Sequence, residues 1–206
     1  MEAIRSAIII LVAVAIYSAI HSFLASLWLK KRVRTMFGVE SDRWFRLFYN
    51  GFAVVSLIPV LALLALLPDL AIYSIPFPWA YINLAIQGLA GVALAVGVWQ
   101  TGVWSFLGIQ QFLYPPRKKA PVLVVRGMYR WVRHPLYTAG LVLIWLTPVM
   151  TLSVFALDLG LTIYLVVGAL FEERKLVKEY GLAYEEYRKR TPMLIPDFPQ
   201  GEQGKG

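Results

Sequence analysis

The stretch Leu-Val-Val-Arg-Gly-Met-Tyr-Arg-Trp-Val-Arg-His-Pro-Leu-Tyr-Thr-Ala-Gly, from Leu123 to Gly140, places three arginines and a histidine between two long apolar segments. A new apolar helix is expected to begin where this stretch ends. Pro135 suits the first turn of that helix, because the missing proline N–H would have no partner there anyway. The free N–H groups of the turn, next to Arg133 and His134, predict a corner that attracts an anion.

Composition identifies an integral membrane protein. Hydrophobic residues make up 59% of the 206 residues, charged residues only 16%, and the mean hydropathy is +0.63. This apolar content exceeds what one soluble core requires, and apolar runs long enough to cross a bilayer recur along the chain. The first run starts near Ala7 and continues past twenty residues into a basic cluster without an Ala-x-Ala site, so it is expected to be an anchor rather than a cleaved signal.

The chain has no cysteine and only two histidines, His21 and His134. The lack of cysteine excludes disulfides, thiolate metal sites and a cysteine nucleophile. Two histidines are too few for a histidine-rich zinc or di-iron centre. We therefore expect no metal site.

The net charge of +8 comes from basic residues gathered in three places. They lie at 30–46, 117–133 and 174–190, which would all be on one side of a membrane crossed five times. The positive-inside rule then places the N-terminus outside and the C-terminus in the cytoplasm, in a cytoplasmic (inner) membrane. We expect these charges to set topology and to meet anionic lipid headgroups rather than nucleic acid.

Five transmembrane helices are predicted, in an all-α polytopic fold. Spans four and five are joined too tightly for anything but an antiparallel hairpin, and a cytoplasmic or interfacial helix follows them. The predicted spans lie at about 7–29, 45–67, 79–104, 136–151 and 153–171. We expect a single integral membrane domain (1–206) with three parts: helices one to three (1–104), a cofactor-binding loop with the hairpin and the C-terminal helix (105–196), and a flexible tail (197–206).

Polar residues inside the apolar runs allow two interpretations. His21 in span one is a functional candidate, because an ionisable group in hydrocarbon is costly; alternatively, it is a neutral histidine bonded to a neighbouring helix through one of the nearby serines. Gln111 can face a polar ligand or can simply belong to an interfacial loop. We assign no functional role to Asp158, which lies within span five.

A second polar cluster, Glu172 and Glu173, lies where span five leaves the bilayer. The hairpin brings it close in depth to Arg133 and His134. The simpler alternative is ordinary charge pairing along the helix, such as Glu172 with Lys175. That alternative explains adjacent glutamates at a membrane edge less well.

Together the two clusters resemble the C-terminal signature of the isoprenylcysteine carboxyl methyltransferase family and its relatives, which include phospholipid N-methyltransferases. Three short motifs, His21-Ser22, Ala25-Ser26 and Phe106-Leu107-Gly108, look more like the bacterial branch that contains methanethiol S-methyltransferases and proteins associated with nitric oxide reductase. The matching C-terminal residues are Leu123-Val124, Gly127-Met128-Tyr129, Arg133-His134-Pro135-Leu136-Tyr137, Gly140, Glu172-Glu173, Leu176, Gly181, Tyr184, Tyr187 and Pro192.

This resemblance implies an S-adenosylmethionine site between the start of span four and the exit of span five. Arg133 would bind the carboxylate of the donor, and Glu172 and Glu173 its ribose hydroxyls and amino group. Tyr129 and Tyr137 would face the adenine or the sulfonium, a cation that aromatic faces attract. The residues expected to bind the cofactor are Gln111, Leu123, Val124, Gly127, Tyr129, Arg133, His134, Tyr137, Glu172 and Glu173.

The acceptor predicted from the sequence is a small or lipophilic thiol that enters from the bilayer, with His21 and Arg133 as catalytic residues. His21 would help to deprotonate the thiol. No basic residue lies between Arg46 and Arg117 to hold a prenylated carboxylate. An isoprenylcysteine carboxylate and a phospholipid amine remain alternatives, as do an NADPH-dependent membrane reductase and a non-catalytic module that binds a hydrophobic ligand.

Overall fold

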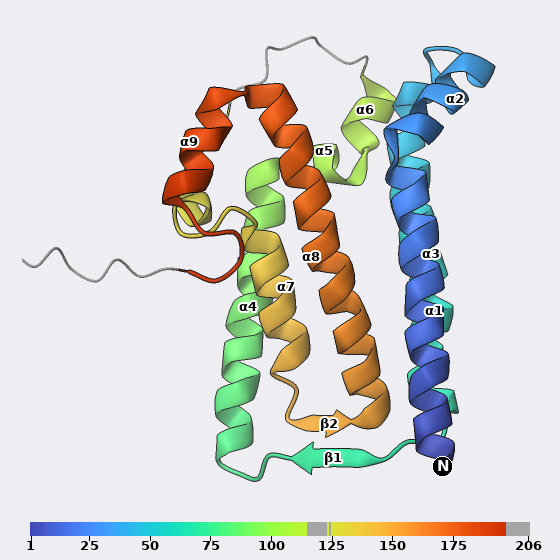
Figure 1. The fold of residues 1–206 in the computed structure, drawn as a ribbon, viewed down its shortest axis with the longest axis vertical. Coiled ribbons are helices and arrows are strands. Elements are labelled where there is room, and N and C mark those ends of the chain that lie inside the picture. Colours follow the sequence, from blue (N-terminus) through green and yellow to red (C-terminus); the bar gives the residue numbers. More distant parts are fainter. Residues whose placement is uncertain (115–122, 124, 197–206) are drawn as a thin grey trace, which may run out of the picture.

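The computed structural model describes residues 1–114, 123 and 125–196. Val124 and the predicted tail, 197–206, lie outside this part of the chain. Four of its helices are long and apolar enough to cross a membrane: α1 (Glu2–Ala25), α3 (Ser41–Leu66), α4 (Trp79–Thr101) and α8 (Leu152–Tyr180). They run side by side along the long axis of the molecule (Figure 1). The structure therefore confirms an all-α polytopic membrane fold.

The predicted count of five spans is not confirmed, because the fourth apolar segment forms only a short helix. This helix, α7 (Pro135–Trp145), has 11 residues. At 1.5 Å per residue it is about 16 Å long, against about 30 Å of hydrocarbon. The strand β2 (Val149–Thr151) then joins it to α8.

A two-stranded ribbon closes one end of the bundle, which we call the ribbon end. Strand β1 (Ala71–Ser74), between α3 and α4, pairs antiparallel with β2. The Asp69 carboxylate strengthens this link by accepting hydrogen bonds from the N–H groups of Leu70 (2.8 Å) and Ser153 (3.1 Å). The ribbon thus ties the α3–α4 connection to the α7–α8 connection, in place of the bare hairpin turn predicted from the sequence.

The opposite end carries the short helices α2 (Leu27–Phe37), α6 (Ile109–Leu113) and α9 (Leu182–Arg190), and we call it the polar end (Figure 1). The first span does not continue to Leu29 as predicted, because the chain breaks at Ser26. The Ser26 backbone is extended, and its hydroxyl accepts a hydrogen bond from the Leu29 N–H (3.2 Å), which starts α2 (Leu27–Phe37). A serine that caps a new helix outweighs the apolar character of Leu27 and Trp28.

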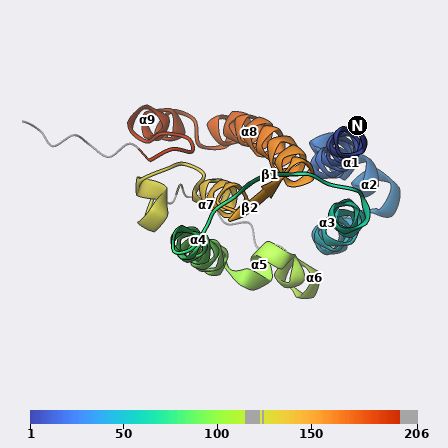
Figure 2. The same cartoon turned by 90° about the horizontal axis from the view of Figure 1, so that it is seen from below.

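Close packing holds the long helices in two groups. Helix α8 packs mainly against α1 and α7 mainly against α4, so the two arms of the hairpin have different partners (Figure 2). Gly160 allows the first contact, because a Cβ there would lie 2.7 Å from Val14. Gly97 allows the second, since a Cβ there would collide with Leu136. Small residues thus permit close helix approach at both interfaces.

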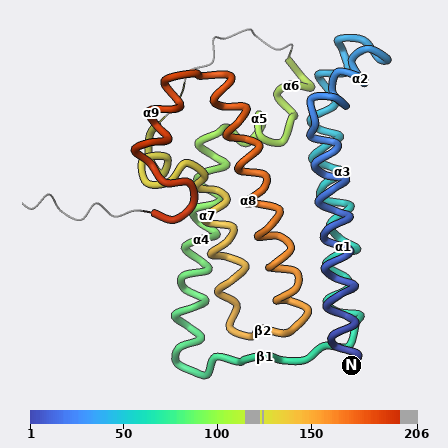
Figure 3. The backbone as a smooth tube through the Cα atoms, in the orientation of Figure 1, coloured from blue at the N-terminus to red at the C-terminus, as the bar shows by residue number. Residues whose placement is uncertain are grey.

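Short helices complete the polar end. After α4 the chain forms α5 (Val103–Leu107) and α6 (Ile109–Leu113), which meet at Gly108 (φ +91°). A Cβ at Gly108 would lie 2.8 Å from the backbone nitrogen of Leu47, so only glycine fits. The 3₁₀ turn η1 (Gly127–Arg130) precedes α7, and α9 (Leu182–Arg190) folds back beside it from the end of α8 (Figure 3).

Candidate active site

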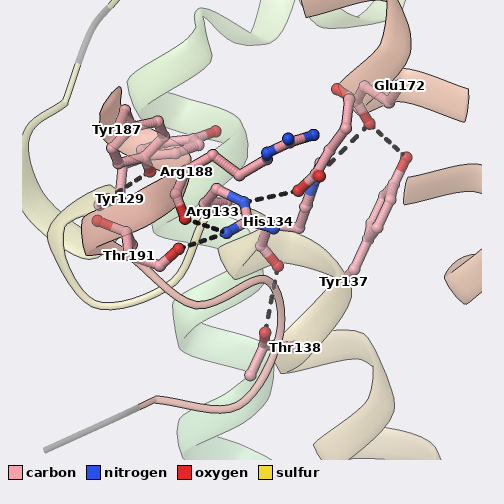
Figure 4. Close-up of polar contacts among 10 residues, drawn as sticks. Tyr129, Arg133, His134, Tyr137, Thr138, Glu172, Tyr187, Arg188 and Thr191 are labelled. Carbon is pink, nitrogen blue, oxygen red and sulfur yellow. Dashed lines mark hydrogen bonds and ion pairs between the residues drawn. The ribbon is translucent and has the colours of Figure 1, made fainter. Parts of the chain in front are cut away.

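Arg133 and Glu173 meet in a buried ion pair at the polar end. Arg133 lies two residues before α7, and Glu173 lies in α8. The Arg133 Nε–H donates to Glu173 Oε1 at 2.6 Å, and the two side chains are only 10% and 8% exposed. The structure therefore brings together the two clusters that the sequence placed at the same depth (Figure 4).

His134 lies between the two glutamates. Its Nε2 is 3.4 Å from Glu173 Oε1, and its Nδ1 is 3.7 Å from Glu172 Oε2. The ring stacks on that of Tyr137 with centroids 5.3 Å apart, and the Tyr137 O–H donates to Glu172 Oε2 at 2.9 Å. Within the described residues, the buried Nε2 of His134 has no hydrogen-bond partner. Tyr137, rather than the Lys175 of the simpler alternative, is thus the hydrogen-bond partner of Glu172.

The segment after α9 is bound to the start of α7. The backbone N–H groups of Arg133 and His134 donate to the carbonyls of Pro192 (2.9 Å) and Met193 (3.1 Å). The Thr138 hydroxyl donates to the Leu194 carbonyl at 2.6 Å. We call residues 191–194 the C-terminal strap. Carbonyls of the strap therefore occupy the N–H groups of Arg133 and His134 themselves, whereas the anion-binding corner was predicted at the N–H groups of the helix turn that follows.

Arg133 also contacts the strap through its side chain. Its Nη1 donates to the carbonyls of Arg188 (3.0 Å) and Thr191. Two of the three guanidinium nitrogens therefore bond protein groups. Arg133 thus links α8, α9 and the C-terminal strap, which the sequence did not predict.

A cavity of about 720 Å³ opens beside this network. Arg133 and His134 form part of its wall, together with five other residues that were predicted to bind the cofactor. These are Leu123, Gly127, Tyr129, Tyr137 and Glu172. Most of the predicted cofactor residues therefore surround one space.

Two of the residues predicted to bind the cofactor do not line the cavity. Glu173 instead bonds the wall residue Arg133 and lies 3.4 Å from His134. Gln111 instead donates through Nε2 to the backbone carbonyl (3.2 Å) and the hydroxyl (3.1 Å) of Ser105, which does line the cavity. The short helices α5 and α6 bring Ser105 within reach, and nothing in the sequence predicted them.

Arg46 and Gln100 line the cavity but were not predicted to do so. From the sequence, Arg46 counts among the basic residues that set the orientation in the membrane. No role was assigned to Gln100, at the end of the third span. Gly127 lies beside Gln100 and has a φ of +59°, a backbone conformation that favours glycine. The available signal was the position of both polar residues at the polar ends of apolar helices.

Three tyrosines cover the cavity and remain neutral at physiological pH. Burial, followed by the nearby Glu173 carboxylate, raises the pKa of Tyr184 to about 12. Burial, followed by Tyr184, raises the pKa of Tyr187 to about 12. Burial and the Glu172 carboxylate also raise the pKa of Tyr129. These side chains offer aromatic faces and hydroxyl donors, and the Tyr187 O–H donates to the Tyr129 carbonyl.

His21 does not belong to the cavity wall. It lies in α1 and bonds tyrosines of two other helices, Tyr49 of α3 (3.0 Å to Nδ1) and Tyr164 of α8. The predicted serine partner is therefore wrong, because the longer tyrosine side chains reach across from the neighbouring helices. The structure places His21 apart from the other predicted site residues.

Comparison with known proteins supports the resemblance carried by the two C-terminal clusters. Residues 84–183 match the family model described as phospholipid methyltransferase. A methanethiol S-methyltransferase of Crocosphaera subtropica is 34% identical over 128 residues, which cover 57% of this chain and 50% of the relative. Methanethiol S-methyltransferase 2 of Bradyrhizobium diazoefficiens is 45% identical over 69 residues, which cover 34% of this chain and 27% of the relative.

A more distant match links the chain to the isoprenylcysteine enzymes. The protein-S-isoprenylcysteine O-methyltransferase of Schizosaccharomyces pombe is 34% identical over 125 residues, which cover 50% of this chain and 51% of the relative. The matched region spans about half the length, or less, of each of these three relatives. No solved structure matches the chain. The family resemblance predicted from the sequence, including its bacterial branch, is confirmed.

Proposed function

We propose, on the premise that residues 84–183 belong to the phospholipid methyltransferase family, that the protein transfers a methyl group from S-adenosylmethionine to a small or lipophilic thiol. The observation that carries this proposal is the cavity in which Glu172, His134 and a set of tyrosines converge. The family supplies the class of reaction, and the cavity supplies a place for the donor.

The residues present fit S-adenosylmethionine. A volume of about 720 Å³ lies within the range of about 300–1,000 Å³ that is usual for small-molecule sites. His134 is a wall residue, and its buried Nε2 lies 3.4 Å from Glu173 Oε1 without a hydrogen-bond partner within the described residues, so the ring retains unused hydrogen-bonding capacity. The wall also combines carboxylate, guanidinium and aromatic groups, which are the groups that a zwitterionic sulfonium nucleoside requires.

Each part of the donor has a partner in this proposal. Glu172 accepts hydrogen bonds from the ribose hydroxyls or the ammonium, supported by Glu173 from behind. The carboxylate binds Arg126, Arg46 or the remaining Nη2 of Arg133, all of which belong to cavity-lining residues.

Apolar and aromatic groups complete the site. Leu123 and Gly127 lie against the adenine, while Tyr129 and Tyr137 turn ring faces to the cationic sulfur. The bound donor would supply a methyl group activated by a sulfonium. The chain then acts mainly by orientation and by excluding water, and both depend on the tyrosine cover from α9.

A thiol is favoured over the other acceptors for two reasons. Between Arg46 and Arg117 the sequence has no lysine or arginine that would hold a carboxylate substrate in α3 or α4. The 45% identical relative reported above is also a methanethiol S-methyltransferase, whereas the isoprenylcysteine enzyme is 34% identical. An isoprenylcysteine carboxylate and a phospholipid amine are the competing acceptors.

We also propose that the polar end faces the cytoplasm and that the chain crosses the inner membrane five times. The basic residues of α2, the end of α8 and α9 lie at this end. In this arrangement α7 and the following residues up to β2 make the fourth crossing, where α7 packs against α4 and α8. The donor enters from the cytosol and the thiol from the bilayer.

Methyl transfer from labelled S-adenosylmethionine by the purified protein in detergent tests this function. The acceptors compared are a small alkanethiol, a prenylcysteine and a lipid amine, and NADPH oxidation is measured in parallel. We expect labelled thioether to form, and to disappear in His134→Ala while the protein remains folded. NADPH oxidation without methyl transfer would instead indicate a reductase. Folded protein that shows neither reaction would indicate a non-catalytic membrane module.

A further inference from the structure

Three helices converge on His21 inside the membrane-spanning part of the molecule. Its ring lies against those of Tyr17 from its own helix, Tyr49 from α3 and Tyr164 from α8, with centroids 5.7, 4.7 and 5.6 Å away. Each of these side chains is half-buried. These three tyrosines are the titratable groups that the structure shows against the ring.

Two tyrosine hydroxyls share one nitrogen of this ring. Tyr49 and Tyr164 both lie within hydrogen-bond distance of Nδ1. A neutral Nδ1 has a single lone pair and can accept a proton from only one hydroxyl at a time. A protonated Nδ1 can instead donate to either hydroxyl oxygen. The arrangement therefore accommodates both protonation states and leaves one hydroxyl able to bond a third group.

The His21 cluster, defined as His21, Tyr49 and Tyr164, is close to the cavity along α3. Arg46 lines the cavity, and Tyr49 follows it by three residues, or about 4.5 Å along the helix. Asn50 then donates to the carbonyls of Phe106 and Leu107, both at 2.9 Å, and Phe106 is itself a wall residue. The cluster thus lies about one helical turn further along α3 than the wall residue Arg46.

We propose that His21, through the hydroxyl of Tyr49 or Tyr164, accepts the proton of the thiol acceptor. This inference rests on the proposed methyl transfer and assigns the acceptor side of the same site. The acceptor sulfur lies between the cavity and these hydroxyls. An alkanethiol is largely protonated at neutral pH, as cysteine with its pKa of about 8.5 already is, so a proton acceptor increases the fraction of reactive thiolate.

The step balances as follows. The S–H proton moves to a tyrosine oxygen while the proton of that hydroxyl moves to His21 Nδ1. The sulfur lone pair forms a bond to the methyl carbon, and the bond between that carbon and the sulfonium sulfur breaks, leaving its electron pair on the donor sulfur. The products are a methyl thioether and neutral S-adenosylhomocysteine. The His21 imidazolium then returns its proton to water.

The test compares thiols of different acidity in His21→Asn and wild-type protein. At neutral pH we expect kcat/KM for an alkanethiol to fall by about 100-fold, the usual scale of general-base catalysis. For an arenethiol that is already ionised at this pH, we expect kcat/KM to remain close to the wild-type value. The affinity for S-adenosylhomocysteine, measured by calorimetry, should be unchanged.

A second readout does not depend on turnover. A chromophoric thiol is titrated by absorbance on the protein saturated with S-adenosylhomocysteine. The wild-type protein should lower the apparent pKa of the bound thiol, and His21→Asn should abolish that shift. If His21→Asn fails to fold, Tyr49→Phe and Tyr164→Phe carry the same test, with Tyr73→Phe on the exposed ribbon as the matched control.

The outcomes are distinguishable. An equal loss with both thiols, or no loss with either, while S-adenosylhomocysteine still binds, overturns the proton-accepting role and leaves methyl transfer standing. A folded wild-type protein that neither binds S-adenosylhomocysteine nor methylates a thiol overturns the proposed function and this inference together.

Discussion

The polar end and the His21 cluster both hold polar side chains inside a membrane protein, but they stabilise them in different ways. At the polar end, full charges are paired at 2.6 Å between Arg133 and Glu173, and the Arg133 Nη1 donates to the carbonyls of Arg188 in α9 and Thr191 in the C-terminal strap. About one turn further along α3, at His21, the partners are tyrosine hydroxyls. Of these two sites, the one at the helix ends pairs full charges and the one inside the bundle pairs neutral hydrogen-bonding groups. This difference matches a charged donor at one level and an apolar acceptor at the other.

Breaking the buried ion pair should have the largest effect. Glu173→Gln leaves the Arg133 guanidinium without its counter-charge, and removing one partner of a buried pair typically costs about 3–5 kcal/mol. We expect a corresponding fall in the free energy of unfolding, measured by denaturant titration in detergent. Glu179→Gln, an exposed glutamate on the same helix, is the control. Equal stability of the two variants would show that the pair contributes nothing to folding.

Glu172→Gln should affect binding rather than stability, because this carboxylate is 47% exposed. Loss of a charge-assisted hydrogen bond, worth about 1.5–3 kcal/mol, should weaken S-adenosylhomocysteine by about 10- to 100-fold. Calorimetry measures the affinity, with Glu186→Gln on the exposed side of α9 as the control. Affinity equal to that of the wild type would remove Glu172 from the donor site.

Alkaline pH should loosen the tyrosine cover. Because burial raises the pKa of Tyr184 from about 10 to about 12 in the folded state, the folded protein favours the neutral phenol. Its contribution to stability is complete below pH 10 and is lost as the pH rises towards 12. Unfolding midpoints between pH 9 and pH 12 should therefore fall less steeply in Tyr184→Phe than in the wild type. The exposed Tyr73→Phe should follow the wild-type curve, and parallel curves for Tyr184→Phe would contradict the assignment.

The smallest effect is expected at Gln111. Gln111 does not line the cavity, and its amide bonds Ser105, so Gln111→Ala should leave the affinity for S-adenosylhomocysteine unchanged and cost about 0.5–1.5 kcal/mol of stability. Gln100→Ala is the matched comparison, because Gln100 lines the cavity. Weaker binding in Gln111→Ala alone would restore the assignment made from the sequence.

The sequence predicted the features that depend on long-range apolar pattern. Runs of apolar residues gave α1, α3, α4 and α8, because burial in lipid requires length and hydropathy and little else. The hairpin also predicted that Arg133 and Glu173 lie at one depth, and the structure shows them in contact.

Features that depend on short segments and backbone partners were not predicted. The strands β1 and β2 have only four and three residues, too few for a recognisable alternation. The C-terminal strap binds Arg133 and His134 through backbone carbonyls, which every residue possesses and no sequence pattern marks. Nothing in the sequence distinguishes Tyr49 and Tyr164 from other aromatic residues in the apolar runs. Only the packing of α1, α3 and α8 brings both hydroxyls to His21.

Titration of S-adenosylhomocysteine into the purified protein tests the central claim most directly, that the cavity at the polar end binds a methyl donor. We predict saturable binding of one molecule per chain, which His134→Ala abolishes and Gln111→Ala leaves intact. Absence of saturable binding by folded wild-type protein, or undiminished binding by His134→Ala, would contradict the claim.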